Sequence, residues 1–406
     1  MTEKEALEAP EQNSSNATEN TAAEASPDNG EALALSKDQV RIAAWLRFML
    51  VWLFCLVVVG GLVRLTHSGM SIPDWPVIYY GPEQTKPSIL PPFSEASWQQ
   101  AYNTYYQEVV LRPNSEYGER SMGQFKREFW TEWGHRGLAK GFAILYLAVL
   151  IQTWRKKALR ERIFGLLLTA GLILFFQIVL GGVVVRKHTP ALYVSFHLTT
   201  AFIFVAMVAW SALKIARPYE APKPPKAPAL TKLAWAVAII CLVQVFSGGI
   251  VANTKAGLHY NTWPAIGETI IPPLSVLWSD IYEPVIRNFV DNIVLVQFIH
   301  RWLAFGVAAM VFVLAGVLFM KPLSTPGRWA VRAVVFTVGF QILLGIYTLL
   351  EGIPVVPAAL HLGTGLVLFV LLISLVFEVR HNNAIYALEL EKEAKLQKEL
   401  EAQLAA

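Results

Sequence analysis

Charged side chains and cysteines are both scarce in this sequence, and each shortage excludes a class of protein. Of its 406 residues, 16% are charged and 54% are hydrophobic, which is far more apolar than an ordinary soluble domain. The net charge is only +4, and no basic region is interleaved with aromatic residues, so nucleic-acid binding is not expected. The two cysteines, Cys55 and Cys241, lie in long apolar segments, where a single thiol is usually a packing residue. We therefore expect neither a disulfide nor thiol chemistry.

What the sequence does contain is a series of long apolar segments. A bilayer core about 30 Å thick is crossed by roughly 20 apolar residues in a helix, and eight segments meet this requirement. They cover residues 42–65, 133–154, 163–185, 191–213, 233–251, 293–320, 329–350 and 355–377. We predict an all-α membrane protein with eight transmembrane helices, and the even number of spans places both termini on the same side of the bilayer.

The distribution of basic residues predicts which side that is. Lys and Arg cluster in the loops after the second, fourth and sixth segments, at residues 154–162, 214–232 and 321–332, and such clusters are typical of cytoplasmic loops. We therefore place these loops and both termini in the cytoplasm. The two long loops on the opposite face, about 65–131 and 253–292, are rich in Pro, Trp, Tyr and Asn and should cover the outer ends of the helices.

The two ends of the chain have compositions of their own. Residues 1–40 are acidic, rich in Ser, Asn and Ala, and lack the patterns of a signal or transit peptide. We expect them to form a disordered cytoplasmic tail of a bacterial inner-membrane protein. Residues 380–406 alternate Leu with Glu and Lys at helical spacing. This pattern predicts a charged, solvated cytoplasmic helix, and a contact in a homo-oligomer is the alternative.

The two halves of the chain repeat each other. Three constant offsets, of 188, 165 and 164 residues, align successive spans of the first half with those of the second. The most distinctive matched positions are Trp75-Pro76 with Trp263-Pro264, His135-Arg136 with His300-Arg301, Phe176-Gln177 with Phe340-Gln341, and His197-Leu198 with His361-Leu362. We predict two four-helix halves, residues 41–214 and 233–379, joined by a cytoplasmic linker at 215–232. Since four spans is an even number, the halves run in the same direction, as parallel repeats.

Four of the eight histidines lie inside predicted spans, and these four are the ones that repeat: His135, His197, His300 and His361. An ionisable side chain in a bilayer is costly and is a functional candidate by default, although a single histidine also serves as a hydrogen-bonding group between helices. Two histidines per half, on helices that run inward from the outer face, can meet at one level. A four-helix bundle presents axial ligands to a haem in this way. Zinc would need further ligands, and only the first half offers one, Glu132.

One position distinguishes the halves chemically. Glu132 precedes His135 by three residues, which puts both on one helix face, and its counterpart before His300 is Gln297. A carboxylate can move a proton or stabilise a developing cation, whereas Gln can only hydrogen-bond. The first half is therefore predicted to be reactive and the second to be structural or electron-carrying. The alternative role for Glu132 is a salt bridge to Arg136.

Arginines and glycines near the outer boundary are weaker candidates. Four arginines are placed to pair with haem propionates, although side chains that reach toward the interface would look the same: Arg64, Arg136, Arg186 and Arg301. Glycines recur near the outer end of the odd-numbered spans, at positions 60, 61, 181, 182, 248, 249 and 345. They permit close approach either of a neighbouring helix or of a flat macrocycle.

Over about residues 40–380, the sequence resembles the haem A synthase family, of the type that lacks a cysteine pair in the outer loop. The matching motifs are Gly-Gly-Leu-Val-Arg-Leu-Thr-His-Ser-Gly-Met-Ser at 60–71, Glu-Trp-Gly-His-Arg at 132–136, His197-Leu198, Asn261-Thr262-Trp263-Pro264, Phe298-Ile299-His300-Arg301 and Ala359-Leu360-His361-Leu362-Gly363-Thr364. The resemblance implies an oxidoreductase that converts the C8 methyl group of haem O into a formyl group, which gives haem A for terminal oxidases.

The resemblance also implies roles for individual residues. His135 and His197 would hold the substrate haem O, Glu132 would be the catalytic acidic residue, and His300 with His361 would ligate the iron of a resident haem b. As partners we expect the lipid bilayer, a haem O synthase and an electron acceptor that the sequence does not identify.

Two other functions suit a pair of histidine sites. A non-enzymatic di-haem cytochrome that exchanges electrons with quinone would need four such histidines equally, but it predicts no need for Glu132 and equal retention of both haems. A transporter with two pseudo-symmetric sites predicts alternating access. The histidines lie near the outer face rather than at the midplane, which does not favour the transporter.

Overall fold

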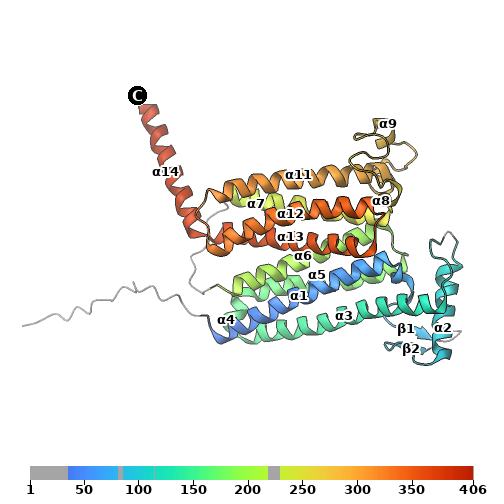
Figure 1. Ribbon diagram of the computed structural model, residues 1–406. Helices are drawn as coiled ribbons and strands as arrows, with labels where there is room; N and C mark the ends of the chain where they lie inside the picture. The colour runs from blue at the N-terminus through green and yellow to red at the C-terminus, as the bar shows by residue number, and fades with distance from the viewer. Residues whose placement is uncertain (1–34, 81–85, 114, 218–228, 406) are drawn as a thin grey trace, which may run out of the picture. The chain divides into compact units, whose positions relative to one another are not determined.

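The computed structural model describes residues 35–80, 86–113, 115–217 and 229–405, and long helices dominate it (Figure 1). Eight helical segments of this described part are long and apolar enough to cross a membrane, which confirms the predicted all-α class and the number of spans. The eight helices are α1 (Lys37–Leu65), α3 (Met122–Arg155), α5 (Gly165–Arg186), α6 (Ala191–Ile215), α7 (Ala229–Asn253), α11 (Ile293–Phe319), α12 (Thr325–Leu350) and α13 (Val355–His381). The chain is therefore a multi-pass membrane protein.

Several helices begin before the apolar segments that predicted them, because polar residues cap them. The Ser36 side chain accepts a hydrogen bond from the backbone of Gln39 and so starts α1 at Lys37, inside the stretch expected to be a disordered tail. Ser121 caps α3 in the same way, so this helix extends well outside residues 133–154. Phe125 and Phe129 on the extension are buried, and their burial adds to the capping in stabilising it.

The outer extension of α3 forms the wall of a small core made by the first outer loop. This loop contains the two-stranded antiparallel pair β1 (Ile78–Tyr80) and β2 (Lys86–Ser88), followed by α2 (Glu95–Tyr105). Trp98 and Tyr105 of α2 pack there against Phe125 and Phe129. In the second outer loop, the short helices α8 (Ala256–His259) and α9 (Leu274–Leu277) pack against α11. Each outer loop therefore packs against the helix of its own half that carries the first repeated histidine, which is His135 on α3 and His300 on α11.

The two halves pack their helices in the same pattern. In the first half α1 contacts α3 and α6, and α5 contacts α6; in the second, α7 contacts α11 and α13, and α12 contacts α13. The halves meet where α1 lies against α13, α6 lies against α7, and α6 lies against α13. Since α1 corresponds to α7 and α13 corresponds to α6, the contact of α1 with α13 is equivalent to the contact of α7 with α6. The packing thus supports the predicted duplication.

Uncommon backbone conformations recur at the same sequence offsets. His67 has φ 57° and Lys255 has φ 55°, and these residues are 188 positions apart, the offset that aligns the first span with the fifth. Thr189 has φ 58° and Ile353 has φ 62°, 164 positions apart. Positive φ is uncommon for residues other than glycine, so these agreements are further support for two copies of one unit.

The predicted domain boundaries are only partly covered by the described residues. Residues 1–34 and 218–228, which hold most of the predicted tail and linker, lie outside them. α7 begins at Ala229, inside the range assigned to the linker, because Leu230 and Thr231 are buried against the bundle. The C-terminal segment forms α14 (Asn383–Ala405), as the leucine spacing predicted, and its Leu390, Leu396, Leu400 and Leu404 are exposed.

Candidate functional site

Each of the four repeated histidines lies against a glycine of a neighbouring helix. At three of these glycines an added methyl group would lie closer to the imidazole than an ordinary contact of about 3.4–4 Å, and at Gly181 it would lie at the short end of that range. The pairs, with the distance from such a methyl carbon to the nearest imidazole atom, are Gly60–His135 (3.1 Å), Gly181–His197 (3.4 Å), Gly248–His300 (3.0 Å) and Gly345–His361 (2.8 Å). The sequence left open what these glycines accommodate. In the structure they give room to the histidines, and they do so at matching positions of both halves.

The two histidines of each half lie near each other. His135 on α3 is close enough to His197 on α6 for a charge on one ring to act on the other, and the same holds for His300 on α11 and His361 on α13. The four rings lie on the four helices that the repeat predicted. In the structure, each histidine lies near the other histidine of its own half.

Glutamines on the third helix of each half hold the backbone beside the second histidine. Gln177 Nε2 donates to the carbonyl oxygen of His197 at 2.8 Å, and Gln341 Nε2 donates to that of His361, also at 2.8 Å. Gln341 further accepts a hydrogen bond from Thr364. Sequence reasoning used these glutamines only as markers of the repeat and missed this role. A glutamine at matched positions inside an apolar span was the available signal.

Glu132 is buried, with 4% of its surface exposed, and it is paired. Arg136 Nε donates to Glu132 Oε1 at 2.5 Å. The rest of the guanidinium clasps the first outer loop, because its Nη1 donates to the carbonyl of Asp74 at 2.6 Å and its Nη2 to that of Ile72 at 2.7 Å. The salt bridge considered as an alternative is therefore present. It fixes one carboxylate oxygen, and no hydrogen bond to Oε2 occurs in the described part of the chain.

The second half repeats this arrangement without the acid. Arg301 Nη1 donates to the carbonyl of Ala265 at 3.0 Å and its Nη2 to that of Tyr260 at 2.8 Å. Gln297, with 2% of its surface exposed, donates to the same Tyr260 carbonyl at 3.3 Å. Arg301 Nε is buried and has no hydrogen-bond partner among the described residues. Arg136 Nε, its counterpart, is the atom that binds Glu132.

The four arginines proposed for haem propionates lie in different surroundings. Arg136 and Arg301 bind loop carbonyls, as described above. Arg64 joins the two halves, since its Nη2 donates to the carbonyl of Ala252 at 2.6 Å and its Nε to Asn253 Oδ1 at 2.9 Å. Arg186 is exposed, and its guanidinium carbon lies 6.0 Å from the ring centre of Trp75. Binding of propionates by any of them stays a prediction.

The histidine pairs fit an axially ligated haem iron. In the described structure, His197 Nδ1 and His361 Nδ1 are buried without hydrogen-bond partners, and a buried polar atom with no partner is costly. Each pair supplies two imidazoles from facing helices, which is the donor set of a bis-histidine haem. Among the described residues, no three or more His, Cys, Asp or Glu side chains are placed to hold a metal ion together, and a zinc site is normally built from at least three such ligands.

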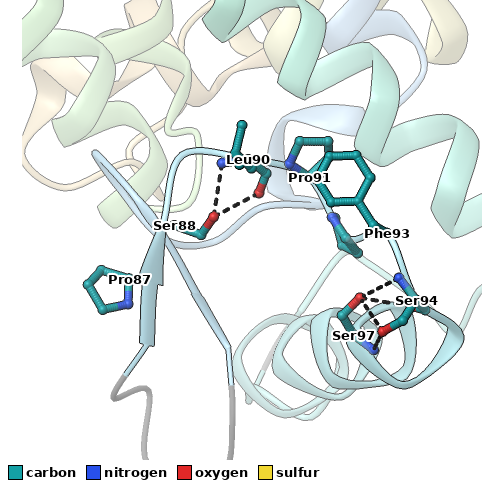
Figure 2. Close-up of a pocket in the computed structure, with 8 residues that line it drawn as sticks. Pro87, Ser88, Leu90, Pro91, Phe93, Ser94 and Ser97 are labelled. Carbon is teal, nitrogen blue, oxygen red and sulfur yellow. Dashed lines mark hydrogen bonds between the residues drawn. The ribbon is translucent and has the colours of Figure 1, made fainter.

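A separate hollow lies in the first outer loop, between the end of β2 and the start of α2. Its lining includes Pro87, Ser88, Leu90, Pro91, Pro92, Phe93, Ser94 and Ser97 (Figure 2). The serines satisfy the local backbone, as when Ser88 Oγ accepts from the Leu90 N–H at 2.9 Å. Among the described residues that line this hollow there is no histidine or carboxylate, so we do not assign it to the candidate site.

Comparison with known proteins agrees with the motifs around these residues. A family model described as Cytochrome oxidase assembly protein (COX15-CtaA) matches residues 43–373. Similar proteins named heme A synthase occur in Rhizobium johnstonii, 33% identical over 82% of this chain and 88% of the relative, and in Allorhizobium ampelinum, 32% identical over 86% and 92%. Another from Methylobacterium radiotolerans is 34% identical over 79% of this chain and 85% of the relative. With eight spans and both histidine pairs inside the matched region, the chain belongs to the COX15-CtaA family of cytochrome oxidase assembly proteins.

Proposed function

We propose that this chain is a haem A synthase, an oxidoreductase that converts the C8 methyl group of haem O into the formyl group of haem A. The observation that carries the proposal is the contrast between a buried Glu132 beside one histidine pair and a buried Gln297 beside the other. Relatives named heme A synthase that align with more than 80% of this chain support it. A protein with two electron-carrying sites would have no use for an acid at only one of them.

In this proposal the two halves have different tasks. His135 and His197 hold the substrate haem O in the first half, and His300 and His361 hold a resident haem b in the second. Haem b, when bound, supplies one-electron transfer toward an external acceptor. The glycines beside the histidines keep the space around each imidazole open, and the glutamine on each third helix fixes the backbone of the second histidine.

Glu132 is the residue that handles protons in this scheme. Arg136 fixes Glu132 Oε1, which orients the carboxylate and leaves Oε2 to accept a proton. Conversion of a methyl group into a formyl group takes up the oxygen atom of a water molecule and releases four protons and four electrons. The electrons pass to the external acceptor, and a carboxylate near the reacting carbon can take up the protons one at a time. Because Arg136 is also bound to two carbonyls of the first outer loop, that loop keeps the acid in place.

The proposed setting is the inner membrane of a bacterium, with both termini in the cytoplasm. Basic residues gather between α3 and α5, where Arg155, Lys156, Lys157, Arg160 and Arg162 follow one another closely, and such clusters stay on the cytoplasmic side. The histidine pairs are then near the outer face. A haem O synthase in the same membrane would supply the substrate, and the acceptor of the electrons would be a third partner. The exposed leucines of α14 are the surface on which a homo-oligomer would form.

The experiment that tests the function is haem extraction and chromatography from membranes that contain a haem O synthase together with this chain. We expect haem A from the wild type, and none from Glu132→Gln although haem b stays bound. The matched control is Gln297→Glu, which should still make haem A because the second half performs no methyl oxidation. Haem b alone in every form would overturn the synthase and leave the di-haem cytochrome.

A further inference from the structure

The two histidines that occupy matching positions on α3 and α11 differ in what holds their rings. His300 Nδ1 lies 2.9 Å from Ser247 Oγ, on α7. One repeat earlier, on α1, the residue in the place of Ser247 is Val59, which cannot hydrogen-bond through its side chain. In the described part of the structure, no hydrogen bond reaches the ring of His135. The difference is separate from the contrast between Glu132 and Gln297, because it lies on α1 and α7 rather than on α3 and α11.

Neighbouring contacts determine what the Ser247 hydroxyl can offer to the ring of His300. The Ser247 hydroxyl donates its single hydrogen to the carbonyl oxygen of Gln244 at 2.8 Å, so its lone pairs are left to accept. Gln244 Nε2 donates to the carbonyl oxygen of His300 at 3.0 Å and lies 3.1 Å from His300 Nδ1, so this amide contacts both the backbone and the ring of the same residue. An imidazole that binds iron through Nε2 carries its hydrogen on Nδ1. In that form His300 Nδ1 is placed to donate to Ser247 Oγ, whose own hydrogen is already bound to Gln244.

A histidine held in this way is a better iron ligand than one that is not. A hydrogen bond from the second ring nitrogen fixes the tautomer and the ring orientation and raises the basicity of the ligating nitrogen. Gln244, the second residue in contact with His300, is also replaced in the first half, by Leu56. His135 consequently lacks both of these hydrogen-bonding partners, and we expect its ring to bind iron more weakly and to turn more freely.

We propose that Ser247, supported by Gln244, is a positioning residue that makes the haem of the second half resident, and that Val59 and Leu56 make the first site exchangeable. This inference rests on the proposed function, in which one haem is substrate and must leave as product while the other stays. A ligand that releases its haem suits the first task and one that retains it suits the second. The two halves are thus specialised by retention as well as by the acid.

Single-haem forms of the full-length chain make the test specific to one half. His197→Ala removes a ligand of the first site and leaves one haem on the second, and in this background Ser247→Val copies the residue of the first half. We expect transfer of haem from the purified protein to apomyoglobin to become at least about tenfold faster. This expectation does not depend on a change in the reduction potential of the haem that stays bound. Ser247→Thr keeps the hydroxyl and should restore slow transfer.

The reciprocal change protects the test against a variant that merely fails to fold. In a His361→Ala background, which leaves a haem on the first site, Val59→Ser should slow haem transfer and sharpen the low-temperature absorption band of the bound haem, because the ring of His135 gains a fixed orientation. Transfer rates unchanged in both Ser247→Val and Val59→Ser would overturn the proposal. Since haem release is measured without haem A formation, a chain that makes no haem A yet shows both effects would refute the synthase and leave the role of Ser247 standing.

Discussion

The outer ends of α3 and α11 are built from the same parts and differ in one charge. Arg136 and Arg301 each donate through Nη2 to a carbonyl of their own outer loop, those of Ile72 and Tyr260, which are one repeat of 188 residues apart. Only Arg136 also binds a carboxylate. The arginine therefore holds the outer loop in both halves, whereas the acid is present in only one half. Chemistry is therefore sought at Glu132, and stability at both arginines.

Removing the acid should have the largest effect of any single change at these sites. Glu132→Gln gives the first half the side chain that the second half has at this position, and it keeps the shape of Glu132. Because loss of a general acid or base typically lowers a rate about 10²- to 10⁴-fold, haem A formation per bound haem should fall by at least about a hundredfold. The measurement is a time course of haem A by chromatography. Activity within about twofold of the wild type would mean that the acid serves only its salt bridge.

The two arginines offer a test on stability. Arg136→Ala would leave the buried carboxylate of Glu132 without its partner, and breaking a buried ion pair in this way costs about 3–5 kcal/mol. Arg301→Ala removes the same loop contacts but leaves only the neutral Gln297, so it should cost less. Thermal unfolding in detergent, followed by tryptophan fluorescence, compares the two variants. The double variant Glu132→Gln, Arg136→Ala should recover part of the loss, and equal losses in the two single variants would show that the loop contacts alone matter.

The glycine beside each histidine can be tested in the second half with a control on the same helix. In Gly345→Ala the new methyl group would lie 2.8 Å from His361 Cε1, whereas at Gly339, also on α12, an added methyl has no neighbour within 4 Å. Overpacking of this kind typically costs about 1–3 kcal/mol, so Gly345→Ala should lower the haem content of a purified His197→Ala form and Gly339→Ala should not. Equal haem content in both would show that the helices separate freely at this point.

The sequence predicted the arrangement of the helices far better than the contacts between their side chains. The eight spans follow from apolar length, and the histidine pairs follow from offsets that need no structure. The outer extension of α3 was missed because it depends on the Ser121 cap and on burial of Phe125 and Phe129 by a distant loop. Contacts such as that of Ser247 with His300 depend on how far each helix is rotated about its own axis. The spacing of side chains along one helix does not determine its rotation relative to a second helix. The signal was nonetheless visible, since aligning the halves sets Ser247 opposite Val59.

The smallest expected effect concerns the place where the first outer loop meets the second half. Lys255 Nζ lies 2.9 Å from Glu116 Oε2, and the hydrogen bond from Lys255 lowers the pKa of Glu116. Burial lowers the pKa of His67, and the nearby charges of Arg64 and Lys255 lower it further. Glu116 and His67 therefore stabilise the folded state when they are deprotonated.

Their contributions have the same sign and different pH windows. A lowered pKa means that the unfolded state binds the proton first, so stability is complete above the unfolded pKa and is lost as pH falls through it toward the folded value. For His67 this loss begins below about pH 6.5, and for Glu116 below about pH 4.5. We expect acidification from pH 7.5 to 5.5 to destabilise the wild type more than His67→Asn, in which Asn tolerates the positive φ of this position. The difference should stay below about 1 kcal/mol, because both groups are partly exposed and solvent screens them, and a difference of the opposite sign in thermal unfolding would mean that His67 is protonated in the folded protein.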